Sequence, residues 1–281
     1  MPLVNMRDLL SKAEKGKYAV GSFSVANMEM LIGAIKAGEE LNSPMIIQIA
    51  EVRLNASPLE LIGSMMVAGA KKAKIPVAIH FDHGLTLEKI KEALQLGFTS
   101  VMIDGSKYPL KDNIRLTREV IDEAKKYNAD VEAEIGRVGG SEDGLKEISG
   151  LFTGVDEARE FFDATGVDAL AVAIGNAHGV YLENPKLNFD VLDKINKRVD
   201  VPLVLHGGTG ISDDDFRKCV SLGIRKINIA TATFASVEEN VGKLYEESEK
   251  VDYFELHEKE IEGAYINVKR HIKIFGSQNK A

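Results

Sequence analysis

Three apolar segments of this chain each end in a histidine that is followed directly by a glycine. These are His83-Gly84, His178-Gly179 and His206-Gly207. Continuous apolar, β-branched runs are typical of strands buried on both faces, so polar residues gathered at one end favour chemistry over packing. Neutral imidazoles are good ligands for Zn²⁺, and three protein ligands leave the open position that a catalytic zinc needs. The recurrence therefore predicts a three-histidine metal site.

Acidic side chains lie at the same strand ends. Asp82 directly precedes His83, and Asp104 and Glu134 close two further apolar runs. In a regular strand Asp82 and His83 would point to opposite faces, so we expect the strand to end between them, beside Gly84. Asp104 and Glu134 could bind a metal or could orient the histidines as hydrogen-bond acceptors, and the sequence leaves both interpretations open.

Two later loops have the features of a phosphate site. The segment Gly207-Gly208-Thr209-Gly210 follows one apolar run, and Asn228-Ile229-Ala230-Thr231 follows the next. Glycines expose backbone N–H groups, and each loop opens into a predicted helix, whose N-terminus favours anions. We therefore predict that the two loops bind phosphate.

The remaining histidines differ in their surroundings. His80 lies two residues inside its predicted strand, so we expect an inward-facing group behind the metal ligands. His257 and His271 lie in the polar C-terminal part of the chain, and we expect both to be solvated at the surface.

Short β-branched runs alternate with longer helical segments along the whole chain, which favours a parallel sheet with helical crossovers. The expected strands are Tyr18–Phe23, Met45–Ile49, Val77–Asp82, Ser100–Asp104, Asp130–Ile135, Ala169–Ile174, Leu203–His206 and Lys226–Ile229. The expected helices lie near 27–41, 58–73, 86–96, 111–127, 155–165, 188–199, 212–222 and 231–248. This order is that of an α/β protein with a (β/α)8 TIM barrel, which typically needs about 250 residues. Because no linker-like stretch interrupts it, we expect residues 1–281 to form a single domain.

Local signals refine this picture. Ser212 and Thr86 are expected to cap their helices, and Ser57-Pro58 reads as an N-cap followed by proline at the first helical position. The glycine-rich segment 136–154 is too long for an ordinary connection, and such loops are usually lids or binding loops.

Beyond residue 250 we expect a C-terminal helical extension that packs on the outside of the barrel or on another subunit. Its apolar stripe at helical spacing is Ile261, Tyr265, Val268, Ile272 and Phe275.

Composition narrows the classes of function. A formal charge of −8 argues against a nucleic-acid partner, and no apolar run approaches the roughly 18 residues of a membrane span. Cys219 is the only cysteine, which excludes an intrachain disulfide, and the N-terminus lacks the pattern of a signal peptide. We therefore expect a cytoplasmic enzyme that acts on a small molecule.

With these motifs the chain resembles the class II, zinc-dependent ketose-bisphosphate aldolases of the fructose- and tagatose-bisphosphate type. The resemblance covers nearly the whole chain. Besides the two phosphate loops it rests on Asp82-His83-Gly84, on residues 131–136, and on Gly139-Gly140 with Glu142-Asp143.

The resemblance implies reversible cleavage of a ketose 1,6-bisphosphate to dihydroxyacetone phosphate and an aldehyde such as glyceraldehyde 3-phosphate. Zn²⁺ would be held by the three histidines, with Glu134 and Asp104 matching an alternative or second metal position. Glu142 matches the acid/base that takes the proton from the nucleophilic carbon. Asp82 matches the group that protonates the aldehyde oxygen, or removes the C4 hydroxyl proton during cleavage.

The resemblance also assigns the phosphate positions and further partners. The ketone phosphate would be gripped at Gly179, Gly207, Gly208, Thr209, Asn228 and Thr231. Backbone there would also hold a monovalent cation, Na⁺ or K⁺, and a homodimer or homotetramer is expected.

Two positions depart from the family pattern. Ala230 stands where fructose-bisphosphate enzymes commonly carry Asn or Asp, and a small Ala at this position is similar to tagatose-bisphosphate aldolases. Ala50 stands where fructose-bisphosphate relatives often have Ser or Thr. Both lie on the aldehyde side, so the aldehyde could be that of a different sugar phosphate or sugar acid.

Three other functions compete with this one. A metal-dependent barrel hydrolase usually carries His-x-His on strand one, which has no histidine here. A Schiff-base aldolase would need Lys107 or Lys226 as its nucleophile and would leave the histidines unexplained. A non-catalytic phosphosugar-binding protein predicts damage among the catalytic positions, and none is seen.

Overall fold

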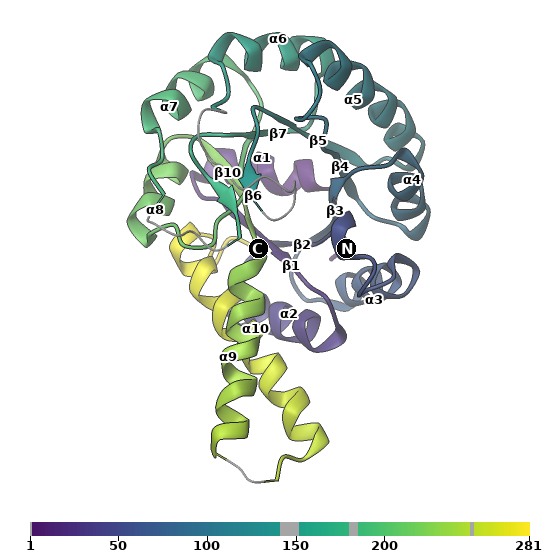
Figure 1. Cartoon of the computed structure of the whole chain (residues 1–281), viewed down its shortest axis with the longest axis vertical. Helices are drawn as coiled ribbons and strands as arrows, with labels where there is room; N and C mark the ends of the chain where they lie inside the picture. The colour runs from purple at the N-terminus through teal and green to yellow at the C-terminus, as the bar shows by residue number, and fades with distance from the viewer. Residues whose placement is uncertain (1, 141–151, 180–184, 248–249) are drawn as a thin grey trace.

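Eight parallel strands close into a barrel with helices between them, which confirms the predicted (β/α)8 fold (Figure 1). The computed structural model describes residues 2–140, 152–179, 185–247 and 250–281. Neighbouring strands around the barrel follow the order β1-β10-β9-β7-β5-β4-β3-β2. The barrel strands are β1 Val20–Ser24, β2 Met45–Ala50, β3 Val77–Gly84, β4 Ser100–Ile103, β5 Asp130–Ile135, β7 Ala169–Val172, β9 Leu203–Leu205 and β10 Ile224–Ile229.

Helices surround the barrel and close one of its ends. The helices that each follow a barrel strand are α2 Met28–Glu40, α3 Leu59–Lys72, α4 Leu87–Leu96, α5 Leu110–Ala124, α6 Val155–Thr165, α7 Phe189–Arg198, α8 Asp213–Ser221 and α9 Thr231–Glu247. Two short 3₁₀ turns are η1 Glu51–Arg53 and η2 Lys125–Tyr127. The chain adds α1 Met6–Gly16 before the barrel and α10 Tyr253–Phe275 after it.

Helix α1, which the sequence analysis did not predict, seals the N-terminal end of the barrel. Its buried face of Met6, Leu9, Leu10 and Ala13 packs against apolar side chains of the barrel interior. Those interior side chains are Val20, Ile46, Ala78, Ala169, Ala171 and Val204. The end of the barrel that α1 covers is therefore a closed apolar core.

Polar side chains take over the same inward-facing positions nearer the C-terminal ends of the strands. On β3 the alternation runs Ala78, His80, Asp82, and these residues pair in register with Ile46, Gln48 and Ala50 of β2. Because side chains of a strand alternate between faces, each step of two residues up the strand moves from the apolar layer into a polar one. This alternation delivers buried polar groups to one end of the barrel.

Local details both confirm and correct the predictions. Thr86 and Ser212 accept hydrogen bonds from backbone N–H groups in the first turns of α4 and α8, as expected for N-caps. Ser57 is not the predicted N-cap, because its hydroxyl donates to the carbonyl of Ala26 and α3 begins after Pro58. The first strand begins at Val20, two residues later than predicted.

The predicted lid segment is described only at its ends. Strand β6 Gly139–Gly140 pairs in parallel with β8 Ala177–His178 in a separate two-stranded sheet. Thr153 donates to the carbonyl of Ile135 and accepts from the backbone of Ala173, which ties the far end of the segment to the barrel. Glu142 lies outside the described residues.

Helix α10 packs on the outside of the barrel against α2 and α9, which confirms the predicted apolar stripe (Figure 1). The surface prediction for His271 was wrong, because its ring is buried against Phe216 and Phe275. His257 is only partly buried, but its Nδ1 contacts the carboxylate of Glu29 on α2 instead of solvent alone. No helix in the described part of the chain combines the length and the apolar character needed to cross a membrane.

Burial of His271 predicts an acid-sensitive contribution to stability. Burial lowers the pKa of His271 from 6.5 to about 4, although Nδ1 donates to the carbonyl of Asn267. Between these two values the unfolded chain binds a proton here and the folded chain does not, so acidification lowers the free energy of unfolding by roughly 3 kcal/mol in total. Replacing His271 by Leu should remove this part of the pH dependence of Tm, whereas His257→Gln should keep it. Parallel Tm profiles for parent and His271→Leu between pH 7 and 4 would contradict the assignment.

The contact of α2 with α10 predicts a second effect on stability. A Cβ at Gly33 would lie 2.4 Å from the carbonyl oxygen of Ile261 and 2.9 Å from Cβ of Ala264. We expect Gly33→Ala to destabilise the fold by about 1–3 kcal/mol, because overpacking outweighs the better helix propensity of alanine. Gly242→Ala on exposed α9 is the matched control, since its Cβ meets no atom within 4 Å, and it should stabilise slightly. If urea unfolding showed equal gains in the free energy of unfolding for Gly33→Ala and Gly242→Ala, then α2 and α10 could separate freely and the prediction would be wrong.

Candidate active site

A bulge near the end of β3 lets Asp82 and His83 serve the same site, although regular alternation would point them to opposite faces of the strand. The register against β4 shifts between Phe81 and Gly84, and His83 adopts the left-handed φ of 42°. The prediction that the strand ends between Asp82 and His83 was therefore wrong, because pairing resumes at Gly84. A side chain at Gly84 would press on the carbonyl of Met102, since a Cβ would lie 2.4 Å from it.

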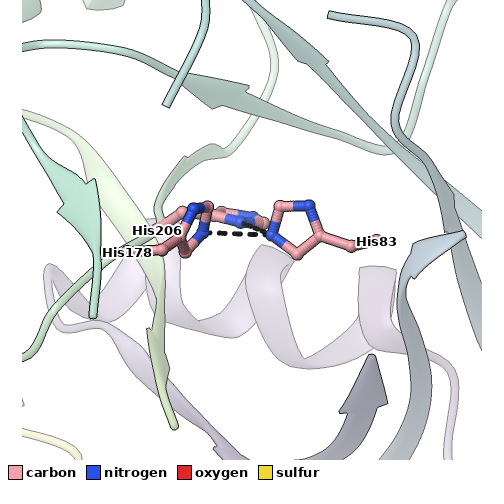
Figure 2. A group of neighbouring side chains, drawn as sticks. All are labelled: His83, His178 and His206. Atoms are coloured by element: carbon pink, nitrogen blue, oxygen red, sulfur yellow. Dashed lines mark hydrogen bonds between the residues drawn. The ribbon is translucent and has the colours of Figure 1, made fainter. Parts of the chain in front are cut away.

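The three predicted histidines converge on one point (Figure 2). His83 lies near the end of β3 and His206 directly follows β9, but β7 already ends at Val172, so His178 lies on β8 and not at the end of a barrel strand as predicted. Nε2 of His83 lies 3.1 Å from Nε2 of His178 and 2.8 Å from Nδ1 of His206. The ligand atoms of the three rings all lie within 4.8 Å of one another. Sequence positions separated by 123 residues are thus brought into contact by closure of the barrel.

Acceptors behind two of the rings fix which nitrogen faces the centre. Nδ1 of His83 lies 3.0 Å from Oδ2 of Asp104, and Nε2 of His206 lies 2.8 Å from Oε1 of Glu132. A carboxylate only accepts hydrogen bonds, so each of these nitrogens carries the proton and the opposite nitrogen carries a lone pair. Two lone pairs then face each other across 2.8 Å, an arrangement that repels unless a cation lies between them. The donor set therefore fits a divalent metal ion.

Burial and hydrogen bonding shift the titrations of these groups. Burial lowers the pKa of His206 well below its ordinary value, and the neighbouring His83 lowers it further. Burial alone would raise the pKa of Asp104, but hydrogen bonds from His83 and Ser106 hold that pKa below its ordinary value. The imidazole of His206 and the carboxylate of Asp104 are therefore in the forms that metal binding requires.

Glu134 differs from Asp104 in having little to hold its charge. Oε1 of Glu134 accepts from the backbone N–H of Val138, and the buried Oε2 lies 3.9 Å from Nδ1 of His206. Burial raises the pKa of Glu134 well above its ordinary value, and the carboxylate of Asp104 raises it further. A buried acceptor aimed near the histidines fits an alternative metal position, whereas Asp104 acts as an acceptor for His83.

Asp82 is held by two amide side chains. Nε2 of Gln48 donates to Oδ2 at 2.9 Å, and Nδ2 of Asn228 donates to Oδ1 at 3.1 Å. Gln48 in turn contacts Ser22 and Ser24 of β1. Sequence reasoning missed Gln48, although its place as the one inward-facing polar residue of an apolar strand could have indicated it.

The predicted phosphate loops lie beside Asp82. One cavity is lined by Gln48, Asp82, His178, Gly179, Gly207, Gly208, Thr209, Asn228, Ala230 and Thr231. Every predicted substrate position therefore lines the same cavity. Gly207 has a φ of 63°, and a Cβ there would lie 2.1 Å from the carbonyl oxygen of Ala177, so the close approach requires glycine.

The second loop opens directly into a helix. Helix α9 begins at Thr231, and the backbone N–H of Ala232 donates to the hydroxyl of Thr209 from the other loop. A helix N-terminus and exposed glycine N–H groups together favour an anion. The cavity therefore combines loops that favour an anion with the carboxylate of Asp82 and with His178 of the histidine cluster.

Comparison with known proteins extends this picture to the whole chain. The family described as "Fructose-bisphosphate aldolase class-II" matches residues 4–280. The 6-phospho-5-dehydro-2-deoxy-D-gluconate aldolase of Halalkalibacterium halodurans is 38% identical, over 100% of this chain and 99% of its own length. The fructose-bisphosphate aldolase of Staphylococcus aureus is also 38% identical, over 100% of both chains.

Solved structures agree. The crystal structure of the YdjI aldolase from Escherichia coli K12 superposes with a TM-score of 0.88 at 37% identity, covering 99% of each chain. A family match over nearly the full length and relatives of this similarity leave one conclusion. The chain belongs to the class II fructose-bisphosphate aldolase family and is an aldolase, a carbon–carbon lyase.

Proposed function

We propose that this protein is a zinc-dependent aldolase that cleaves a ketose 1,6-bisphosphate to dihydroxyacetone phosphate and an aldehyde such as glyceraldehyde 3-phosphate. The observation that carries the metal assignment is the pair of ring nitrogens of His83 and His206, 2.8 Å apart, whose other nitrogens donate to carboxylates. With His178 they would hold Zn²⁺, which when bound supplies a Lewis acid that polarises the ketone carbonyl. Family membership supports metal dependence.

The cavity supports the assignment of dihydroxyacetone phosphate to one end. Its phosphate would accept hydrogen bonds from backbone N–H groups around Gly207 and Gly208 and at the N-terminus of α9. The hydroxyl of Thr209 and the backbone of Gly179 line the same end. A monovalent cation beside this phosphate would offset part of its charge.

Asp82 is placed to move a proton at the aldehyde end. Its carboxylate accepts hydrogen bonds from Gln48 and Asn228 and also lines the cavity. We propose that it removes the C4 hydroxyl proton during cleavage and returns it during condensation. Glu142, in the segment outside the described residues, would take the proton from the nucleophilic carbon, as its match to the family motif implies.

The surroundings of Lys226 argue against a role as Schiff-base nucleophile. Its Nζ is buried and lies 2.7 Å from Oε2 of Glu132, and Lys226 is not among the residues that line the cavity. An ammonium group held by a carboxylate is protonated and is a poor nucleophile. The geometry therefore favours the metal mechanism over the lysine mechanism.

The first functional prediction concerns the metal. Purified protein should carry about one catalytic divalent ion per chain, lose activity on exhaustive chelation and regain it with Zn²⁺, because the three imidazoles supply its ligands. Alanine at any of His83, His178 or His206 should remove the bound ion, whereas His257→Ala should retain it. Borohydride with substrate should trap no adduct. Full activity after chelation, or a borohydride-trapped lysine, would refute the metal mechanism.

The second prediction concerns the aldehyde. Ala230 lines the cavity and Ala50 lies in register with Asp82, so neither offers a hydrogen bond to the distal half of the sugar. Apolar surfaces discriminate by roughly 10–200-fold, whereas hydrogen-bonding sites reach 10⁴ or more. We therefore expect kcat/KM for fructose and tagatose bisphosphates to differ by less than about 200-fold. Ala230→Asn should shift the ratio toward fructose bisphosphate, and Ala235→Asn, exposed on α9, should not.

An alternative aldehyde is kept open by the relatives. The relative from Halalkalibacterium halodurans, named for a phosphorylated sugar acid, is as similar to this chain as the fructose-bisphosphate aldolase. Condensation of dihydroxyacetone phosphate with a panel of aldehydes, including one with a carboxylate, tests this second candidate. A parent enzyme that prefers fructose bisphosphate by several orders of magnitude would contradict the weak-discrimination proposal.

A further inference from the structure

A buried ion pair lies directly behind His206 and has no role in the reaction described so far. Glu132 on β5 and Lys226 on β10 are both fully buried, and Nζ of Lys226 lies 2.7 Å from Oε2 of Glu132. The other carboxylate oxygen of Glu132 lies 2.8 Å from Nε2 of His206. The pair therefore connects two strands of the barrel, β5 and β10, to the imidazole that follows β9.

The contact with Glu132 selects one of the two neutral forms of His206. Nε2 must donate to the carboxylate, which leaves the lone pair on Nδ1, the nitrogen that faces His83. The amide nitrogen of Asn228 lies 3.3 Å from the same Nε2, but it is a donor and already donates to Asp82. Within the described part of the chain, Glu132 is thus the acceptor for this proton.

Lys226 holds the other oxygen of the Glu132 carboxylate in place. A carboxylate alone in the barrel interior would be strongly disfavoured, and a cation at hydrogen-bond distance offsets much of that cost. His80 lies on the other side of the pair, with Nε2 3.9 Å from Oε2 of Glu132 and Nδ1 2.9 Å from the hydroxyl of Ser100. His80 is too far away to replace the lysine in direct contact.

We propose that Glu132 is a positioning residue that holds His206 in the form presenting Nδ1 to the metal, and that the hydrogen bond from Lys226 keeps Glu132 in place as the acceptor. The inference rests on the proposed function of the three histidines. Carboxylates behind metal-bound imidazoles typically change metal affinity by 10–100-fold when removed. The alternative is that the ion pair only stabilises the barrel.

A matched pair of double variants separates the two roles. Glu132→Gln with Lys226→Met removes both charges but retains a side-chain oxygen that can accept from Nε2 of His206. Glu132→Met with Lys226→Met removes the charges and the acceptor together, at nearly the same volume. Replacing a buried ion pair by neutral side chains is often neutral for stability, so both proteins should fold with similar Tm.

The readout is Zn²⁺ affinity, measured by competition with a chromophoric chelator. We expect the Gln/Met variant to stay within about tenfold of the parent and the Met/Met variant to bind about 10–100-fold more weakly than Gln/Met. The absorption spectrum of the Co²⁺-substituted protein should change only in the Met/Met variant. Equal Zn²⁺ affinity of both variants and the parent would overturn the proposal.

A second measurement needs no variant. In the metal-free parent, ¹⁵N-resolved NMR of the His206 ring should show the proton on Nε2, and a proton on Nδ1 would overturn the proposal. A parent that binds no divalent ion but shows the Nε2 proton would refute the proposed function while upholding the role of Glu132. The two failures are therefore distinguishable.

Discussion

The polar site depends on one constraint, namely that the inside of a closed parallel barrel admits only every second side chain of each strand. In this chain those positions are apolar near α1 and polar at the opposite end. The apolar layer and the α1 plug supply the core that holds the strands in register. That register in turn fixes the spacing of buried groups such as Gln48, His80 and Asp82, which would be unfavourable if they lacked partners.

Several of the buried polar groups form a hydrogen-bonded chain that ends at His206. Lys226 contacts Glu132, which contacts His206, and Asn228 joins Asp82 to the same region. Each link leaves the next group with one defined hydrogen-bonding role. The order of donors and acceptors therefore determines which ring nitrogens carry lone pairs, and the barrel geometry points these lone pairs at a single position.

Sequence patterns predicted the site where a residue's role follows from its position on a strand. His83, His206 and Asp82 lie at the ends of barrel strands, and the barrel fold alone brings such ends together, whereas His178 joins them from β8, outside the barrel strands. The Glu132–Lys226 pair could not be predicted, because 94 residues separate its members and only the register of distant strands places them in contact. His271 was misassigned for a similar reason, since its aromatic neighbour Phe216 lies on another helix.

Local backbone geometry was the other source of error. Alternation predicts opposite faces for Asp82 and His83, and a bulge with a left-handed φ at His83 overrides it. The α1 helix was missed although its apolar residues recur at helical spacing, because the eight strand-helix repeats already accounted for the barrel. Its partner surface exists only once the barrel has closed.

The two halves of the cavity are built from different materials, and this explains why the reaction is better determined than the aldehyde. The proposed phosphate end includes Gly207 and Gly208, where an added Cβ would lie 2.1 Å from the carbonyl oxygen of Ala177 and 3.0 Å from that of Asn228, respectively. The proposed aldehyde end depends on single side chains such as Ala230. Relatives named for different substrates are each 38% identical to this chain, which agrees with the proposal that a few exchangeable side chains select the aldehyde.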